Sequence, residues 1–186
     1  MVTIGSLWLP ILVSAIVVFF ASFIMWMVSP HHRPDWGKVA QEDDLRAAMR
    51  KAKIGPGQYY IPHCGQPKEM SSPEYVKKLE EGPVAMVVVR PSGKPAMGKS
   101  MAMSFVYNVV VAVFAAYLAT RTLGATADYL AVFRIVGTVT FLSYAGALIW
   151  GPIWFGRTWS STIKEVLDGL VYGLLTAGIF GWLWPR

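Results

Sequence analysis

The sequence predicts an all-α membrane protein: four transmembrane helices, with a small α+β insert outside the membrane between the first and the second. Hydrophobic residues make up 54% of the 186 residues and charged residues only 15%, whereas soluble domains carry about 25% charged residues. The apolar residues also come in blocks long enough to cross a bilayer, for which about 20 residues suffice. We therefore expect an N-terminal anchor (1–29), an insert (30–100) and a three-helix bundle (101–186).

The first predicted span covers residues 4–28 and contains no charged residue. Pro10 lies in its first turns, where a helix tolerates proline, and Trp8 and Trp26 lie near its two ends, as interfacial aromatic residues do. Pro30 follows its last turn. Because no positive segment precedes the apolar run and no small-residue cleavage site follows it, we interpret it as a membrane anchor and not as a signal peptide.

The insert mixes charged residues, prolines and glycines. Acidic residues from Glu42 and basic residues up to Lys53 predict one short helix, with each charge at the helix end that favours it. A second helix is predicted from Ser72 to the Gly82–Pro83 pair, because Ser72 and Pro73 form a typical helix start. Residues 84–89 and 58–61 are predicted strands. A sheet this small is not stable alone, so we expect it to pack against the membrane, against helices or against another subunit.

Three further spans are predicted at 101–123, 129–155 and 163–184, joined by short turns. The short turns require these helices to run antiparallel to one another. We expect Gly151–Pro152 to break or kink the end of the third span. For the fourth span, Thr162 and Glu165 predict a capping box at its start.

The fourth span carries a small residue at every fourth position: Gly169, Gly173, Ala177 and Gly181. On a helix this spacing makes one smooth ridge, against which another helix can pack closely in lipid. The ridge predicts helix packing, either with another chain or with the second or third span of the same chain. We favour packing within the chain, which would leave the first span, the Arg134 side and the insert free for partners.

Charge predicts the orientation. Twelve Lys and Arg residues against eight acidic residues lie between residues 30 and 100, and the net charge is +6. The positive-inside rule places this insert in the cytoplasm and both termini outside, in a bacterial inner membrane. Because no basic cluster is interleaved with exposed aromatic residues, we interpret the charge as orientation and lipid-headgroup affinity and expect no nucleic-acid partner.

Cofactor chemistry has few candidate ligands. The histidines His31, His32 and His63 all lie outside the spans, so no haem ligand at membrane depth is expected and no cofactor is predicted. His31, His32, His63 and Cys64 could form a zinc site with an acid such as Asp35. Their spacing matches no metal motif, and interfacial histidines with a turn cysteine are the simpler interpretation. A single cysteine excludes an internal disulfide.

Two charged residues within the spans are candidate lipid- or partner-binding residues. Arg134 lies about two helical turns inside the third span, where a charge is costly and by default suggests function. It could snorkel to lipid phosphate, pair with another residue, or bind an anionic ligand. Asp168 lies near the predicted cytoplasmic end of the fourth span, and we expect a local ion pair with Lys164.

The layout of one anchor, a long insert and three closely spaced spans looks like that of many bacterial inner-membrane proteins, and no motif assigns it to a named family. No nucleotide-binding, metalloprotease or serine-hydrolase motif is present. We therefore expect a non-catalytic accessory or structural subunit that acts through helix packing in a larger assembly or a homo-oligomer. The alternatives are an oligomeric transporter or channel using Arg134, and a metal-binding membrane enzyme using the histidines and Cys64.

Overall fold

The computed structural model describes residues 2–185. They fall into two compact units: one contains the residues up to Trp36 together with those from Ala96 onward, and the other is Gly37–Pro95. The first helix, predicted as a separate anchor, therefore belongs to the same unit as the C-terminal helices. We call these two units the bundle and the insert.

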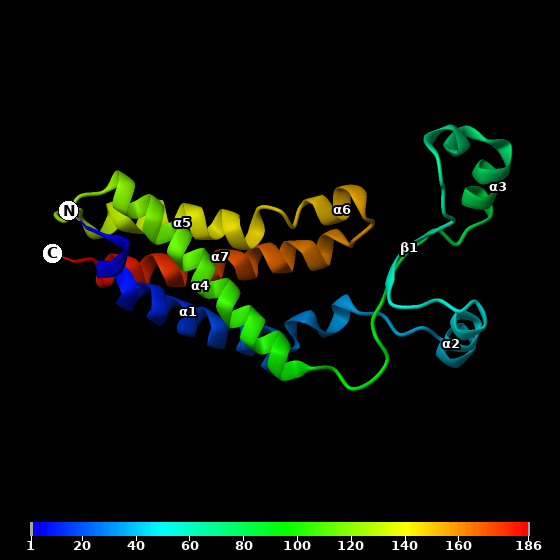
Figure 1. Cartoon of the computed structure of the whole chain (residues 1–186), viewed down its shortest axis with the longest axis horizontal. Helices are drawn as coiled ribbons and strands as arrows, with labels where there is room; N and C mark the ends of the chain where they lie inside the picture. The colour runs from blue at the N-terminus through cyan, green and yellow to red at the C-terminus, as the bar shows by residue number, and fades with distance from the viewer. Residues whose placement is uncertain (1, 186) are drawn as a thin grey trace. The chain divides into compact units, whose positions relative to one another are not determined.

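The bundle consists of long helices that run side by side (Figure 1). A short turn η1 (Ile4–Leu7) leads into α1 (Trp8–Phe23), which continues into the π-helical turn η2 (Ile24–Val28) and, after Ser29, into the 3-10 segment η3 (Pro30–Asp35). The chain returns to the bundle in α4 (Met97–Thr122), α5 (Tyr129–Ala145), α6 (Trp150–Trp154) and α7 (Trp159–Trp182).

Three helical stretches are long and apolar enough to cross a membrane: Ile4–Val28, Met97–Thr122 and Tyr129–Trp154. They correspond to the first three predicted spans, and they make the chain a candidate multi-pass membrane protein. The fourth predicted span, α7, has 24 residues and is not one of these three stretches. Lys164, Glu165 and Asp168 lie in its first half.

The small-residue ridge of α7 lies against α5 of the same chain. Ala177 is fully buried, and a Cβ built on Gly137 of α5 would lie 3.2 Å from its methyl group. A Cβ on Gly173 would lie 3.1 Å from the backbone nitrogen of Phe141, and one on Gly169 would lie 2.9 Å from the Cβ of Ala145. The absence of side chains on the ridge thus lets α5 and α7 approach almost backbone to backbone.

The interior of the bundle is filled from all four long helices. α4 contributes a stripe of alanines, and α1 and α5 contribute larger aliphatic residues. The buried cluster contains Ala112, Ala115, Ala116 and Ala119 of α4 with Leu7, Ile11, Val132, Val136 and Phe180. Small residues on α4 lie in the same buried cluster as larger residues of the other helices, and small residues are what allow helices to pack closely in lipid.

Two predicted details of the helices are wrong, the position of the break in the third span and the start of the fourth span. The third span breaks at Gly146, before the expected Gly151–Pro152 pair, and α6 begins after the break. The fourth span starts earlier than the predicted capping box: Thr158 is the N-cap of α7, and its hydroxyl accepts a hydrogen bond from the Ser161 nitrogen. Glu165 pairs with Arg157 instead of capping the helix.

The insert confirms the predicted elements. It contains α2 (Glu42–Lys51), β1 (Gly57–Ile61), the 3-10 turn η4 (Pro67–Ser71), α3 (Pro73–Glu81) and β2 (Ala85–Val89). β1 and β2 pair antiparallel, with Tyr60 opposite Met86 and Gln58 opposite Val88. Ser72 caps α3 by accepting a hydrogen bond from the Tyr75 nitrogen. Local signals of capping and charge were sufficient to predict the two helices, α2 and α3.

Candidate functional site

The most concentrated polar chemistry of the bundle lies where η3 meets α7. Here the His32 ring is buried between two carboxylates: its Nδ1 lies 2.7 Å from Asp35 Oδ2 and its Nε2 lies 2.8 Å from Asp168 Oδ2. The His32 side chain is only 4% exposed. We call His32, Asp35, Lys164 and Asp168 the histidine network.

η3 presents its side chains to α7 because the first helix ends at this point. Ser29 terminates η2 with extended backbone angles, and its hydroxyl accepts a hydrogen bond from the His31 nitrogen, which starts η3. The tight turn of η3 brings the side chains of His32 and Asp35, three residues apart, together. The Trp26 indole of η2 stacks on the His32 ring at a centroid distance of 3.9 Å and shields it from solvent.

Lys164 completes the network. Its Nζ donates hydrogen bonds to Asp35 Oδ1 at 2.6 Å and to the His31 carbonyl oxygen at 3.0 Å. The expected ion pair between Lys164 and Asp168 is therefore wrong: Lys164 reaches across to η3, and Asp168 pairs with His32. Both groups find partners on a segment more than 120 residues away in sequence, which a pattern along one helix cannot reveal.

The two contacts favour the protonated form of His32. An ionised carboxylate only accepts hydrogen bonds, so a carboxylate at each ring nitrogen favours a proton on both of them. Burial lowers the pKa of His32, but the hydrogen bonds with Asp168 and Asp35 outweigh it and raise the pKa above its ordinary value. The hydrogen bonds from Lys164 and His32 lower the pKa of Asp35. The two carboxylates of the network thus face the hydrogen-bond donors of His32 and Lys164, which offsets part of the cost of burying them.

One buried oxygen atom of the histidine network lacks a hydrogen-bond partner in the part of the chain that the structure describes. Asp168 Oδ1 is buried and has no hydrogen-bond partner among residues 2–185. His31 Nε2 lies 3.9 Å from this oxygen, and the His31 side chain is 39% exposed. His31, His32 and Asp168 each offer one ligand atom, and these atoms lie within 4.8 Å of one another. Part of the predicted metal set, His31 and His32, is thus placed beside a carboxylate that the sequence prediction assigned to another role.

His63 and Cys64 belong to the insert. The Cys64 thiol donates to the carbonyl oxygen of Gln66 at 3.1 Å, which is a turn interaction. Neither residue belongs to the His31–His32–Asp168 group.

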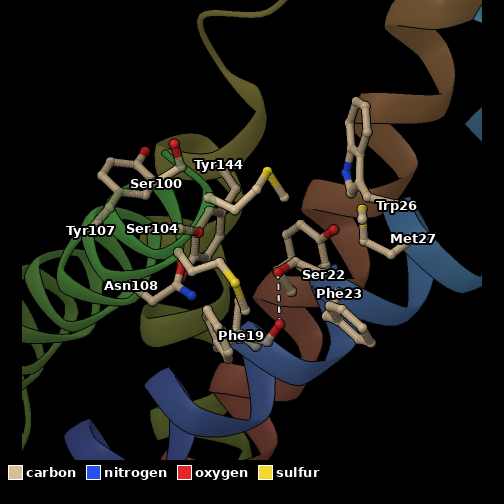
Figure 2. Close-up of a pocket in the computed structure, with 14 residues that line it drawn as sticks. Phe19, Ser22, Phe23, Trp26, Met27, Ser100, Ser104, Tyr107, Asn108 and Tyr144 are labelled. Atoms are coloured by element: carbon tan, nitrogen blue, oxygen red, sulfur yellow. Dashed lines mark hydrogen bonds between the residues drawn. The ribbon is translucent and has the colours of Figure 1, made fainter. Parts of the chain in front are cut away.

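An apolar groove of about 380 Å³ adjoins the histidine network along the first helix and α4. Figure 2 shows Phe23, Trp26 and Met27 on one side of it and Ser104 and Asn108 on the other. The Asn108 amide oxygen accepts a hydrogen bond from the Tyr144 hydroxyl at 3.4 Å, while its Nδ2 is buried without a partner among the described residues.

Arg134 lies elsewhere, on an exposed face of α5. Its neighbours include Phe133, Thr138 and Leu174, which line a shallow hollow between α5 and α7. No salt bridge within residues 2–185 involves Arg134. The structure therefore separates the two predicted charged sites: Asp168 lies inside the bundle and Arg134 on its surface.

No protein-family model, curated protein or solved structure matches the chain. What the protein does must therefore be argued from its own residues.

Proposed function

We propose that this chain is a non-catalytic, four-span membrane protein that acts as an accessory or structural subunit of a larger membrane assembly or of a homo-oligomer. In this proposal the bundle anchors the insert in the membrane, and the insert docks on the partner subunit. The observation that carries the proposal is that no residue of Gly37–Pro95 is buried. A unit without buried side chains has no core of its own.

Several exposed apolar side chains of the insert lie on its sheet. Met86 and Val88 of β2 and Tyr60 of β1 share one face, because Met86 pairs with Tyr60 and residues two apart point the same way. Val88 is 70% exposed and Met86 47% exposed. We call these three residues the sheet patch. A two-stranded sheet is marginally stable alone, and covering the sheet patch would supply the burial that it lacks.

In the proposed membrane topology, α7 is the fourth span. Its 24 residues extend about 36 Å at 1.5 Å per residue, which exceeds the roughly 30 Å of a bilayer core. Its ionic residues, Lys164 and Asp168, lie in its first half and are matched by His32 and Asp35. With four spans, the positive-inside rule favours a cytoplasmic insert and external termini in a bacterial inner membrane.

The transporter alternative depended on Arg134. Its exposed position on α5 and the closely packed α5–α7 pair favour a structural role over a path through the bundle. A lipid headgroup is a sufficient partner for an exposed arginine that can snorkel.

A photo-crosslinking experiment tests the proposal. A benzophenone amino acid is placed at Val88 in the sheet patch and, as the matched control, at Glu80, an exposed polar position of α3 in the same unit. We expect a discrete adduct after irradiation of cells from position 88 and none from position 80. An adduct at twice the 20.5 kDa chain mass indicates self-association, and any other defined mass indicates a different subunit.

The proposal is wrong if position 88 gives no protein adduct and native mass spectrometry from mild detergent shows only the monomer. A Met86→Asp substitution, made in the protein that carries the benzophenone amino acid at position 88, would support the sheet patch as the contact if it abolishes the adduct while the bundle keeps its thermal stability.

A further inference from the structure

We propose that His31, His32 and Asp168 bind a divalent transition metal ion of the zinc type, at the junction of η3 and α7. The inference does not depend on the proposed subunit function, because it rests on the bundle and not on the insert.

The ligand atoms are already close to a coordination geometry. His32 Nε2 lies 2.8 Å from Asp168 Oδ2, His31 Nε2 lies 3.9 Å from Asp168 Oδ1, and all three ligand atoms fall within 4.8 Å of one another. Bonds of about 2.0–2.2 Å to imidazole nitrogen and carboxylate oxygen bring neighbouring ligands roughly 3.0–3.5 Å apart. To complete this arrangement, the partly exposed ring of His31 has to move inward and the 2.8 Å contact between His32 and Asp168 has to widen slightly.

The unpaired oxygen of Asp168 is a second, independent observation that points to a bound cation. Asp168 Oδ1 is buried and has no hydrogen-bond partner among residues 2–185, and the whole residue is only 2% exposed. A buried carboxylate oxygen without a donor is costly. A simple ion pair with His32 satisfies Oδ2 alone, whereas a metal ion shared with His31 also satisfies Oδ1.

The surrounding residues hold the ligands in position. Asp35 Oδ2 accepts from His32 Nδ1 at 2.7 Å, and Lys164 Nζ holds the other Asp35 oxygen at 2.6 Å. A carboxylate on the far nitrogen of a metal-binding histidine fixes its ring orientation and raises its basicity, which is the usual support of such ligands. A bound ion takes the place of the proton on His32 Nε2, and that proton leaves to water.

The donor set selects the class of metal. Two imidazoles and one carboxylate suit zinc and neighbouring first-row ions, whereas calcium and magnesium prefer sites made of oxygen atoms alone. Three protein ligands leave a fourth position for water. Because His31 is 39% exposed, the site has a route for the ion to enter.

Metal content of the full-length protein in nanodiscs tests the inference. The protein is stripped with a chelator, exposed to Zn²⁺, freed of excess ion and analysed for zinc per chain. The decisive variant is His31→Gln, because the ring of His31 makes no hydrogen bond within the described residues and the buried network does not need it. His63→Gln is the matched control, the same substitution in the insert.

We expect one zinc per chain in the wild type and in His63→Gln, and none in His31→Gln, at unchanged thermal stability of the zinc-free proteins. Co²⁺ substituted for zinc should give d–d absorption bands in the wild type that vanish in His31→Gln. Asp35→Asn should weaken zinc binding about 10- to 100-fold, as loss of such a supporting residue does. Less than stoichiometric zinc in the wild type, or equal zinc in wild type and His31→Gln, overturns the proposal.

Discussion

His32 Nε2 lies 2.8 Å from Asp168 Oδ2, and this contact joins residues that are 136 positions apart. It ties the end of the first helix to the fourth. Lys164 makes a second link from α7 to Asp35 of η3. Polar contacts therefore hold this end of the first helix to α7, together with the stacking of Trp26 on His32.

Removing one partner of the pair should destabilise the bundle more than removing both. In metal-free buffer, Asp168→Ala leaves the protonated His32 ring buried without one of its anions, and such a broken pair costs about 3–5 kcal/mol. The double variant His32→Leu/Asp168→Leu replaces the pair by apolar groups and should recover much of that loss. Thermal or denaturant unfolding in detergent measures both effects.

Glu80→Ala, at an exposed position of the insert, serves as the control for this cycle and should stay within about 0.5 kcal/mol of the wild type. Strictly additive losses in the double variant would show that the His32–Asp168 contact carries little coupling.

Gly173→Ala should destabilise the bundle by about 1–3 kcal/mol, the usual cost of overpacking. The added methyl group would lie 3.1 Å from the backbone nitrogen and 3.2 Å from the Cα of Phe141, and backbone atoms of a packed helix cannot rotate away. The same substitution at Gly98, near the start of α4, meets no atom within 4 Å. Gly98→Ala should therefore be neutral or slightly stabilising. Equal unfolding temperatures for the two variants would contradict close α5–α7 packing.

The parts of the fold that depend on neighbouring residues could be predicted from the sequence. The capping of α3 by Ser72, the charge pattern of α2 and the apolar length of three spans are all local. The start of α7 was misplaced because two overlapping signals compete: Thr158 caps the helix, so Thr162 falls inside it.

The histidine network could not be predicted, because its contacts cross from η3 to α7. Within each segment the signals were present: His32 and Asp35 at a spacing of three, and Lys164 and Asp168 at a spacing of four. Local spacing suggested that Lys164 and Asp168 pair with each other. The structure shows instead that both residues pair with η3: Asp168 with His32, and Lys164 with Asp35.

Arg134→Gln should leave the stability of the bundle unchanged within about 0.5 kcal/mol, because Arg134 is exposed and has no salt bridge within the described residues. The Arg134→Gln substitution should instead weaken the binding of anionic lipid, because a snorkelling arginine contacts headgroup phosphate. Native mass spectrometry from vesicles containing anionic lipid should show fewer retained lipids in the variant, with Arg134→Lys close to the wild type. A large loss of stability would instead indicate a structural partner.

Cys64 allows a direct test of orientation, because it is the only cysteine of the chain and lies in the insert. With a cytoplasmic insert, a membrane-impermeant maleimide should label Cys64 in inside-out vesicles and leave it unlabelled in intact spheroplasts. The control is the variant Cys64→Ser/Ala125→Cys, which moves the thiol to the exposed turn between α4 and α5. Because a single span separates that turn from the insert, the labelling pattern should reverse. Labelling of Cys64 in intact spheroplasts would place the insert outside and show that the positive-inside rule fails for a loop of this length.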